Sequence, residues 1–117
     1  MIVNKKEDNI GKLYGKNAVI TGGSRGIGAA IASAFVAEGT KVSIIHHNDH
    51  ANAEKTLHKL QQVNQYCFAF NCDISEQDQV QNTINKVREQ SGTIDILVNC
   101  AGVAEGDVLE KISLAQW

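Results

Sequence analysis

The sequence predicts an α/β protein built on a doubly wound parallel sheet. Short apolar stretches typical of strands alternate along the chain with longer stretches that have apolar residues at helical spacing. A glycine-rich segment, residues 21–28, joins the first expected strand to the first expected helix. Alternation of this kind favours parallel strands that are joined by right-handed crossovers and covered by helices on both faces.

The expected elements follow one another along the whole chain. The first helix has Ile27, Ile31, Ala34 and Phe35 at helical spacing and runs to about Glu38, before a glycine that can cap its C-terminus. Because the first strand is fully apolar in its middle, it is expected to be covered on both faces. The strands are expected at about residues 17–21, 41–45, 66–71 and 94–99.

The sequence also predicts helices later in the chain. A second helix is expected over residues 50–63. Ser75, with Asp78 three residues later, resembles a capping box that opens a third helix, which ends at Ser91-Gly92. Residues 105–117 are expected to begin a further helical segment.

Length and composition suit one soluble globular unit rather than several domains. The chain has 117 residues, of which 43% are hydrophobic and 21% are charged, and its net charge is −2. This balance gives no reason to expect nucleic acid or an anionic membrane as a partner, and no apolar run approaches the roughly 18–20 residues of a membrane span. Residues 1–12 are expected to be a flexible lead-in, and residues 13–117 the N-terminal part of a single, incomplete domain.

The N-terminus and the cysteines favour a cytoplasmic location. The first eight residues have no apolar core and so do not form a secretory signal, and their acidic residues argue against a mitochondrial transit peptide. Cys67, Cys72 and Cys100 lie in or beside expected strands, and this odd number predicts free thiols in a reducing compartment. The mitochondrial matrix is the alternative location.

The glycine-rich segment has the order of strand, turn and helix that a dinucleotide-binding fingerprint requires. Gly22 allows a sharp turn off the strand, Gly26 lets backbone N–H groups approach a pyrophosphate, and Gly28 lets helix and strand pack closely. The helix N-terminus adds unpaired donors and the positive end of its dipole. We therefore expect a Rossmann-type doubly wound parallel sheet, truncated after the fourth of six strands, with a cofactor across the carboxyl ends of the strands.

Four stretches of the chain together resemble the short-chain dehydrogenase/reductase family. The first is the whole string of residues 21–28, although its glycine spacing is Gly-x-x-x-Gly-x-Gly. The others are Leu13-Tyr14-Gly15-Lys16, Cys72-Asp73-Ile74-Ser75 and Asn99-Cys100-Ala101-Gly102. Within the family, the sequence looks most like the 3-oxoacyl carrier-protein reductases of fatty acid metabolism and related carbonyl reductases.

The resemblance implies a set of cofactor-binding residues. Asp73 would accept a hydrogen bond from the adenine amino group, and the stretch after the fourth strand would line the ribose and nicotinamide. Cys100 stands where the family has a second Asn, which puts one inter-strand hydrogen bond in doubt. The expected cofactor-binding residues are Gly22, Ser24, Arg25, Gly26, Ile27, Gly28, His46, His47, Asp73, Ile74, Asn99, Ala101 and Gly102.

The end of the second strand favours NADP over NAD. An NAD-binding chain usually places Asp or Glu there to bind the ribose 2′-hydroxyl, but His46 and His47 occupy this place and the next carboxylate is Asp49. Arg25 matches the basic residue of NADP-preferring members and can offer a fork of donors to a phosphate. Use of NAD through Asp49 is the weaker alternative.

The family's catalytic residues are not found in this sequence. Its chemistry needs a Ser and a Tyr with a Lys four residues later, but Tyr14 and Tyr66 are followed at that distance by Ala18 and Phe70. We therefore expect the cofactor-binding part of an NADP-dependent oxidoreductase that reduces a 3-oxoacyl thioester or a ketone, is a homo-oligomer when complete, and is inactive as these 117 residues alone. The alternative is a non-catalytic truncated module that binds a nucleotide or a protein partner, since an uncovered strand edge favours pairing.

Simpler interpretations stand beside these assignments. The glycine string could be an ordinary turn, Asp73 a turn residue before a helix, and Asn99 a packing residue at the edge of the core. His46, His47 and His50 could hold a metal, but they lack a carboxylate partner at metal-site spacing, so a solvated loop is favoured. The residues Cys67 and Cys72 are expected to pack in the core rather than to take part in redox chemistry.

Overall fold

The computed structural model describes residues 12–101 of the chain. The expected helical segment over residues 105–117, Gly102 and most of the expected lead-in lie outside these residues. The part that is described contains the glycine-rich segment and the ends of all four expected strands.

Four parallel strands form one sheet in the order β3-β2-β1-β4. The strands are β1 (Asn17–Thr21), β2 (Lys41–His46), β3 (Phe68–Asn71) and β4 (Ile96–Asn99). Because β4 returns to the far side of β1, the strand order reverses beside β1, and in such sheets ligands bind outside the carboxyl ends at this point. The expected parallel α/β sheet is confirmed.

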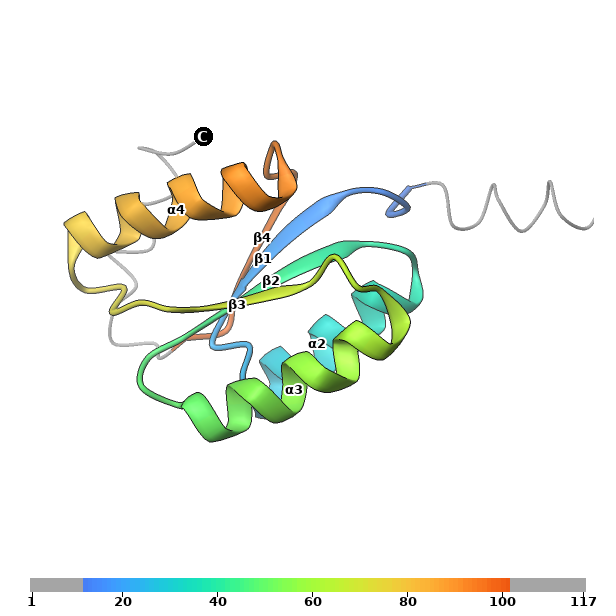
Figure 1. The fold of residues 1–117 in the computed structure, drawn as a ribbon, viewed down its shortest axis with the longest axis horizontal. Helices are drawn as coiled ribbons and strands as arrows, with labels where there is room; N and C mark the ends of the chain where they lie inside the picture. Colours follow the sequence, from blue (N-terminus) through green and yellow to red (C-terminus); the bar gives the residue numbers. More distant parts are fainter. Residues whose placement is uncertain (1–11, 102–117) are drawn as a thin grey trace, which may run out of the picture.

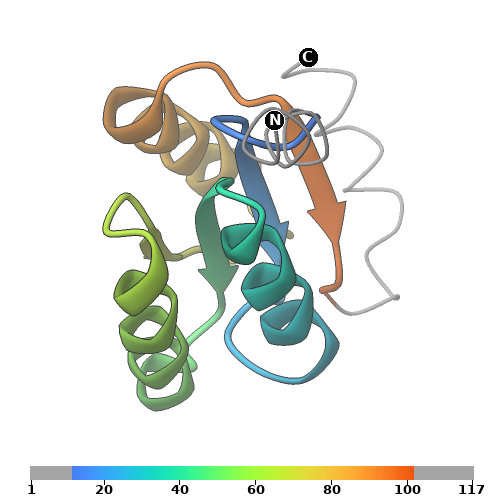
Figure 2. The ribbon, with the colours of Figure 1, turned by 90° about the vertical axis from the view of Figure 1, so that its right-hand side faces the viewer.

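Three described helices cover the two faces of the sheet (Figures 1 and 2). Helices α2 (Gly26–Ala37) and α3 (His50–Val63) lie together on one face, and α4 (Gln77–Ser91) lies on the other. None of the helices in the described part of the chain is long and apolar enough to cross a membrane.

Two apolar clusters fill the space between the sheet and these helices. Ala18 and Ile20 of β1 belong to the cluster with residues of α2 and α3, whereas Val19 belongs to the cluster with α4. Alternate residues of one strand therefore enter opposite layers, which explains why β1 is buried along its whole length. Cys67 and Cys72 are buried in these clusters as free thiols, as expected.

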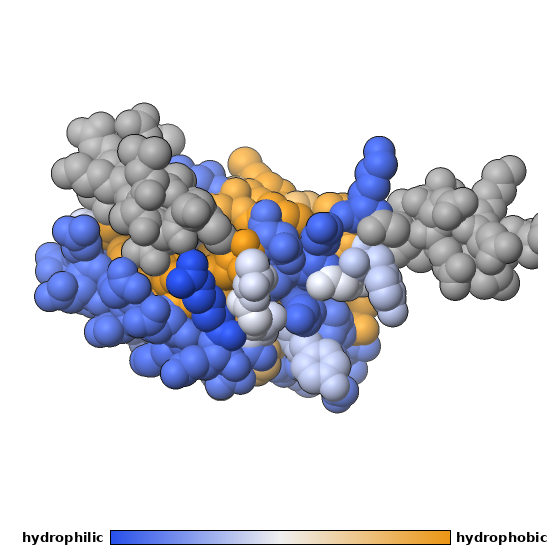
Figure 3. Space-filling model, turned by 90° about the horizontal axis from the view of Figure 1, so that it is seen from above, coloured by the Kyte–Doolittle hydropathy of each residue, from blue (hydrophilic) through white to orange (hydrophobic). Residues whose placement is uncertain are grey.

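The edge of the described sheet is only partly covered. Residues Ile96–Val98 of β4 are half-buried. From above, Figure 3 shows an apolar area in orange among polar residues in blue. Strand β4 pairs with β1 along one side.

Two strands begin later than the sequence suggests. Strand β3 begins at Phe68 instead of residue 66, because Tyr66 is exposed and its backbone N–H donates to the Asn64 side chain in a turn, at 2.9 Å. Strand β4 begins at Ile96 instead of residue 94. The preceding Asp95 accepts a hydrogen bond from the backbone N–H of Asn17 through its side chain, at 2.9 Å.

The expected capping box before α4 is wrong. The N-cap is Glu76 rather than Ser75, and no side chain caps the helix. The Ser75 hydroxyl instead donates to Asp73 Oδ1 at 2.6 Å, and its backbone N–H donates to the same oxygen at 3.0 Å. Because the Ser75 hydroxyl is bonded to Asp73, it does not cap the helix.

Of the larger apolar residues of helix α2, Ile31 and Phe35 pack half-buried against the core, but the fully buried positions belong to other residues. Its buried residues are Gly28, Ala32 and Val36, whereas Ile27 is 76% exposed. Small residues on the buried side let the helix backbone come close to the sheet. This close approach sets the position of the helix N-terminus above the ends of the strands.

The Thr21 hydroxyl joins the ends of β1 and β4. It donates to Asn99 Oδ1 at 3.1 Å and accepts from the backbone N–H groups of Cys100 at 3.2 Å and Ala101 at 3.3 Å. Thr21 itself is 3% exposed. One buried side chain thus fixes the backbone that leaves β4.

Replacing Thr21 with Val should loosen this junction while preserving the shape of the side chain. Amide hydrogen exchange at Ala101 should become about tenfold faster, because the lost hydrogen bond contributes ~1–1.5 kcal/mol. Thr21→Ser keeps the hydroxyl and is the matched control. Unchanged exchange at Ala101 in Thr21→Val would show that the hydroxyl does not hold this segment.

Candidate functional site

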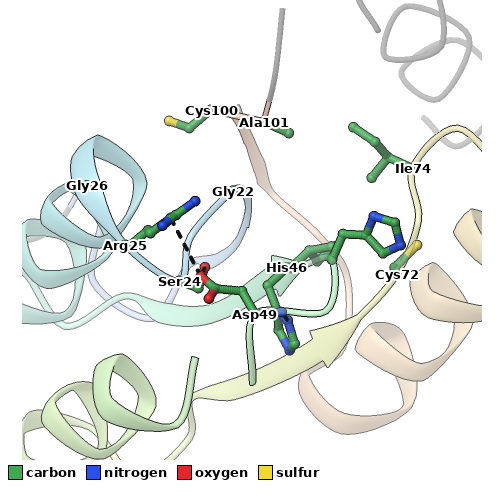
Figure 4. A pocket seen from close by; sticks show the side chains of 12 residues that line it. Gly22, Ser24, Arg25, Gly26, His46, Asp49, Cys72, Ile74, Cys100 and Ala101 are labelled. Atoms are coloured by element: carbon green, nitrogen blue, oxygen red, sulfur yellow. Dashed lines mark hydrogen bonds and ion pairs between the residues drawn. The ribbon is translucent and has the colours of Figure 1, made fainter. Parts of the chain in front are cut away.

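A cleft of about 460 Å³ lies outside the carboxyl ends of the strands (Figure 4). Its size falls within the roughly 300–1,000 Å³ of small-molecule sites. Segments that follow all four strands contribute to its wall. The lining residues are Gly22, Ser24, Arg25, Gly26, Ile45, His46, His47, Asp49, Cys72, Ile74, Cys100 and Ala101.

The cleft brings together most of the cofactor-binding residues that the sequence suggested. Four expected residues do not line it, and Gly102 lies outside the described residues. Those four are Ile27, Gly28, Asp73 and Asn99. The expected residues that line the cleft are Gly22, Ser24, Arg25, Gly26, His46, His47, Ile74 and Ala101.

Two glycines set the shape of the turn between β1 and α2. Gly22 has φ +65°, and a Cβ there would lie 2.8 Å from the carbonyl carbon and oxygen of Cys100. A Cβ at Gly28 would overlap the carbonyl oxygen of Gly22. The turn, the first part of α2 and the segment after β4 therefore touch one another backbone to backbone, which no larger residue would allow.

The N-terminus of α2 opens on the cleft. The helix begins at Gly26, its N-cap is Arg25, and it has no side-chain capping hydrogen bond. Amides of a first helical turn that lack such partners, together with the helix dipole, favour an anion. A Cβ on Gly26 would meet no atom within 4 Å, so open space adjoins these amides.

Asp49, which the sequence suggested only as an alternative contact for NAD, lines the cleft. Its Oδ2 accepts a hydrogen bond from Ser24 Oγ at 2.6 Å and lies 3.7 Å from Arg25 Nε (Figure 4). Its Oδ1 accepts a hydrogen bond from Asn52 Nδ2 at 3.0 Å. The hydrogen bonds from Ser24 and Asn52 lower the pKa of Asp49 below its usual value. The exposed Arg25 side chain projects toward solvent and lies beside the same carboxylate oxygen that Ser24 binds.

His46 is buried, contrary to the expectation of a solvated histidine loop. Its Nδ1 accepts a hydrogen bond from the backbone N–H of Asp49 at 3.1 Å, and its ring lies edge-on to that of His50. Burial, followed by the nearby His50, lowers the pKa of His46. The ring therefore acts as a neutral acceptor that holds the turn after β2. The described residues hold no group of three or more His, Cys, Asp or Glu side chains placed to bind a metal ion.

Asp73 lies at the rim beside the cleft rather than in its lining. Its Oδ2 is 4.0 Å from Nε2 of the exposed His47, and its Oδ1 accepts from Ser75. The hydrogen bonds from Ser75 lower the pKa of Asp73. The geometry leaves an ionised carboxylate next to an imidazole at the edge of the cleft.

Three further residues line the cleft that were not among the expected cofactor-binding residues, namely Ile45, Cys72 and Cys100. Ile45 and Cys72 belong to the apolar core and also close the floor of the cleft. Burial raises the pKa of the Cys72 thiol, which keeps it neutral. For Asp49, the available signal was an Asn-Asp pair directly before a helix, where a chain commonly turns sharply.

The chain matches the short chain dehydrogenase family over residues 16–117. A 3-oxoacyl-(acyl-carrier-protein) reductase from Staphylococcus epidermidis is 31% identical over 102 residues, which cover 87% of this chain and 42% of that protein. A short chain dehydrogenase from Burkholderia cenocepacia, solved in complex with NADP, is 38% identical with a TM-score of 0.74, covering 78% of this chain and 37% of that one.

A 3-ketoacyl-(acyl-carrier-protein) reductase from Brucella melitensis, complexed with NADH, is 33% identical with a TM-score of 0.66. The match covers 73% of this chain and 34% of that one. The chain therefore spans well under half the length of each of these three proteins. With a family match that includes nearly all of the described residues, the chain belongs to the short-chain dehydrogenase family.

Proposed function

We propose that the protein carrying this chain is an NADP-preferring reductase. It transfers hydride between the nicotinamide and a carbonyl or alcohol carbon, with a 3-oxoacyl thioester or a small ketone as the substrate class. One observation carries the choice of NADP. Arg25 projects over the cleft from the glycine turn, while histidines and not carboxylates stand at the end of β2.

The residues present fit a dinucleotide. The open space beside Gly26 and the uncapped start of α2 suit a pyrophosphate. The Arg25 guanidinium offers a fork of donors to a 2′-phosphate. Asp73 and Ile74 would hold the adenine, and Asn99 with the segment after β4 would line the nicotinamide ribose. When bound, the cofactor supplies the hydride chemistry, whereas the chain supplies binding and orientation.

The proposed substrate class, 3-oxoacyl thioesters, is supported by the names of two relatives. The two carrier-protein reductases from Staphylococcus epidermidis and Brucella melitensis act on 3-oxoacyl chains by name. For the choice of dinucleotide, the solved relatives include one NADP complex and one NADH complex. The preference of this chain therefore depends on its own residues, above all Arg25.

Arg25→Ala should weaken NADP binding by about tenfold or more and leave NAD binding nearly unchanged. A charge-assisted hydrogen bond to a phosphate contributes ~1.5–3 kcal/mol, and NAD has no 2′-phosphate to receive it. Isothermal titration calorimetry of the full chain with each dinucleotide measures both affinities.

Arg88→Ala is the matched control for this experiment, because it removes the same charge from the last turn of α4, away from the cleft. Equal weakening of NADP and NAD by Arg25→Ala would contradict the assigned contact. So would a loss of NADP affinity of the same size in Arg88→Ala.

Residues 1–117 alone should bind NADPH without transferring hydride. Neither tyrosine of this sequence has a lysine four residues later, so the pair of side chains that the family's proton transfer needs is not found in it. Following NADPH absorbance with an acetoacetyl thioester and with a small ketone checks this expectation. Steady NADPH oxidation that depends on the ketone and on the purified chain would contradict it.

A further inference from the structure

Helix α3 carries a polar residue on the side that it directs toward the core. Ala53 and Leu60 are buried on this side, and Thr56 lies three residues after the first and four residues before the second, on the same face. The Thr56 side chain is half-buried. A threonine within a helix often donates its hydroxyl to the carbonyl one turn earlier in the same helix.

The Thr56 hydroxyl donates to the glycine-rich segment instead. Its Oγ1 lies 2.6 Å from the backbone carbonyl oxygen of Ser24, which accepts the hydrogen bond. The Ser24 side chain is held from the same helix, since Ser24 Oγ donates at 2.6 Å to Oδ2 of Asp49, the N-cap of α3. Helix α3 and its N-cap therefore hold both the backbone and the side chain of one residue of the glycine turn.

The bond from Thr56 sets the direction of a whole peptide group. The Ser24 carbonyl and the Arg25 backbone N–H belong to one peptide, and in a planar trans peptide they point in opposite directions. Because the carbonyl points toward α3, the Arg25 N–H points away from it. Arg25 and Gly26 line the cleft at the start of α2, whereas Thr56 is not among the lining residues. Thr56 can therefore act on the cleft only through this peptide.

The earlier part of the turn is held from strand β2. The backbone N–H groups of Gly22 and Gly23 both donate to the carbonyl oxygen of Ile45, at 2.8 Å and 3.3 Å. A Cβ on Gly23 would also lie 2.7 Å from the Ile44 side chain. Strand β2 thus fixes the first two glycines, and Thr56 fixes the residue that follows them, directly before the N-cap of α2.

We infer that Thr56 is a positioning residue for the dinucleotide. By holding the peptide between Ser24 and Arg25, its hydroxyl keeps the backbone donors at the start of α2 directed at the phosphates of the ligand. The inference rests on the proposed dinucleotide-binding function. Because NAD and NADP share the pyrophosphate, Thr56 should affect both of them equally, whereas the Arg25 side chain should affect NADP alone.

The expected effect is modest, because a single neutral hydrogen bond is lost. Without this bond, the peptide can take other orientations, and the affinity falls with the fraction of molecules in the binding orientation. The net strength of one such hydrogen bond corresponds to a factor of about five. We therefore expect the dissociation constants of NADP and NAD both to rise about fivefold, with their ratio unchanged.

Two substitutions remove the hydroxyl in different ways. Thr56→Val keeps the branched shape of the side chain, whereas Thr56→Ala introduces the residue that favours helix most. If one variant folds poorly, the other still tests the inference. Thr56→Ser keeps the hydroxyl and should restore binding. Thr40→Val is the matched control, because Thr40 Oγ1 also donates to a backbone carbonyl, that of Leu13 at 3.1 Å, and Thr40 does not line the cleft.

Calorimetric titration of the full chain with NADP and with NAD measures the affinities. Thr56→Val and Thr56→Ala should weaken both dinucleotides about fivefold, Thr56→Ser should stay within about twofold of wild type, and Thr40→Val should change neither affinity. Nuclear magnetic resonance of the ligand-free chain gives a second measurement. The chemical shift of the Ser24 carbonyl carbon should change in Thr56→Val and Thr56→Ala, because that carbonyl loses its donor.

Three results would overturn the role of Thr56. The first is an affinity within about twofold of wild type for both dinucleotides in Thr56→Val and Thr56→Ala. The second is an equal loss of affinity in Thr40→Val, which would indicate general destabilisation. The third is a loss confined to NADP, which would place the effect at the 2′-phosphate rather than at the shared pyrophosphate.

Failure of the underlying function gives a different result from failure of the Thr56 assignment. If neither dinucleotide binds the wild-type chain, the proposed function falls, and the positioning role falls with it even where the Ser24 carbonyl shift changes. If both dinucleotides bind the wild-type chain and the Thr56 variants equally well, the proposed function stands and only the role of Thr56 is wrong.

Discussion

The cleft depends on a steric constraint at one backbone position. The carbonyl of Gly22 packs against Gly28, and its α-carbon packs against the backbone of Cys100, with no room for a side chain on either side. This contact holds the start of α2 and the segment after β4 next to the end of β1. Because β1 is buried along its whole length in the middle of the sheet, the junction has a rigid support. The buried strand β1 therefore fixes the positions of the backbone amides and short loops that line the cleft.

Charge is distributed unevenly around this rigid frame. Arg25 is exposed and lies beside Asp49, whose carboxylate accepts hydrogen bonds from Ser24 and Asn52. The carboxylate is therefore restrained by two hydrogen bonds, whereas the guanidinium is largely exposed to solvent. His46 contributes as a neutral hydrogen-bond acceptor that fixes the turn, rather than as a charge.

The sequence predicted the fold well because its signals were local. Apolar runs, helical periodicity and glycine punctuation identified every described element, and the bounds of β1 and α3 agreed with the structure. The errors arose where one side chain had two choices of partner. Ser75 bonds to Asp73 rather than to the helix, and a local pattern cannot rank these partners. Asp49 was underestimated for a related reason, since its place in the cleft depends on the left-handed Asn48 and on a contact across the sheet with Asn71.

We propose that the cleft at the carboxyl ends of the strands binds a nicotinamide dinucleotide. The most direct test is a nuclear magnetic resonance titration of the isotope-labelled chain with NADP, following the backbone amides. We expect saturable shifts at Gly22, Ser24, Gly26 and Ala101, with little change at the exposed Lys59 of α3. Saturable binding that leaves the glycine turn unperturbed, or no binding at all, would show that the dinucleotide does not bind in this cleft.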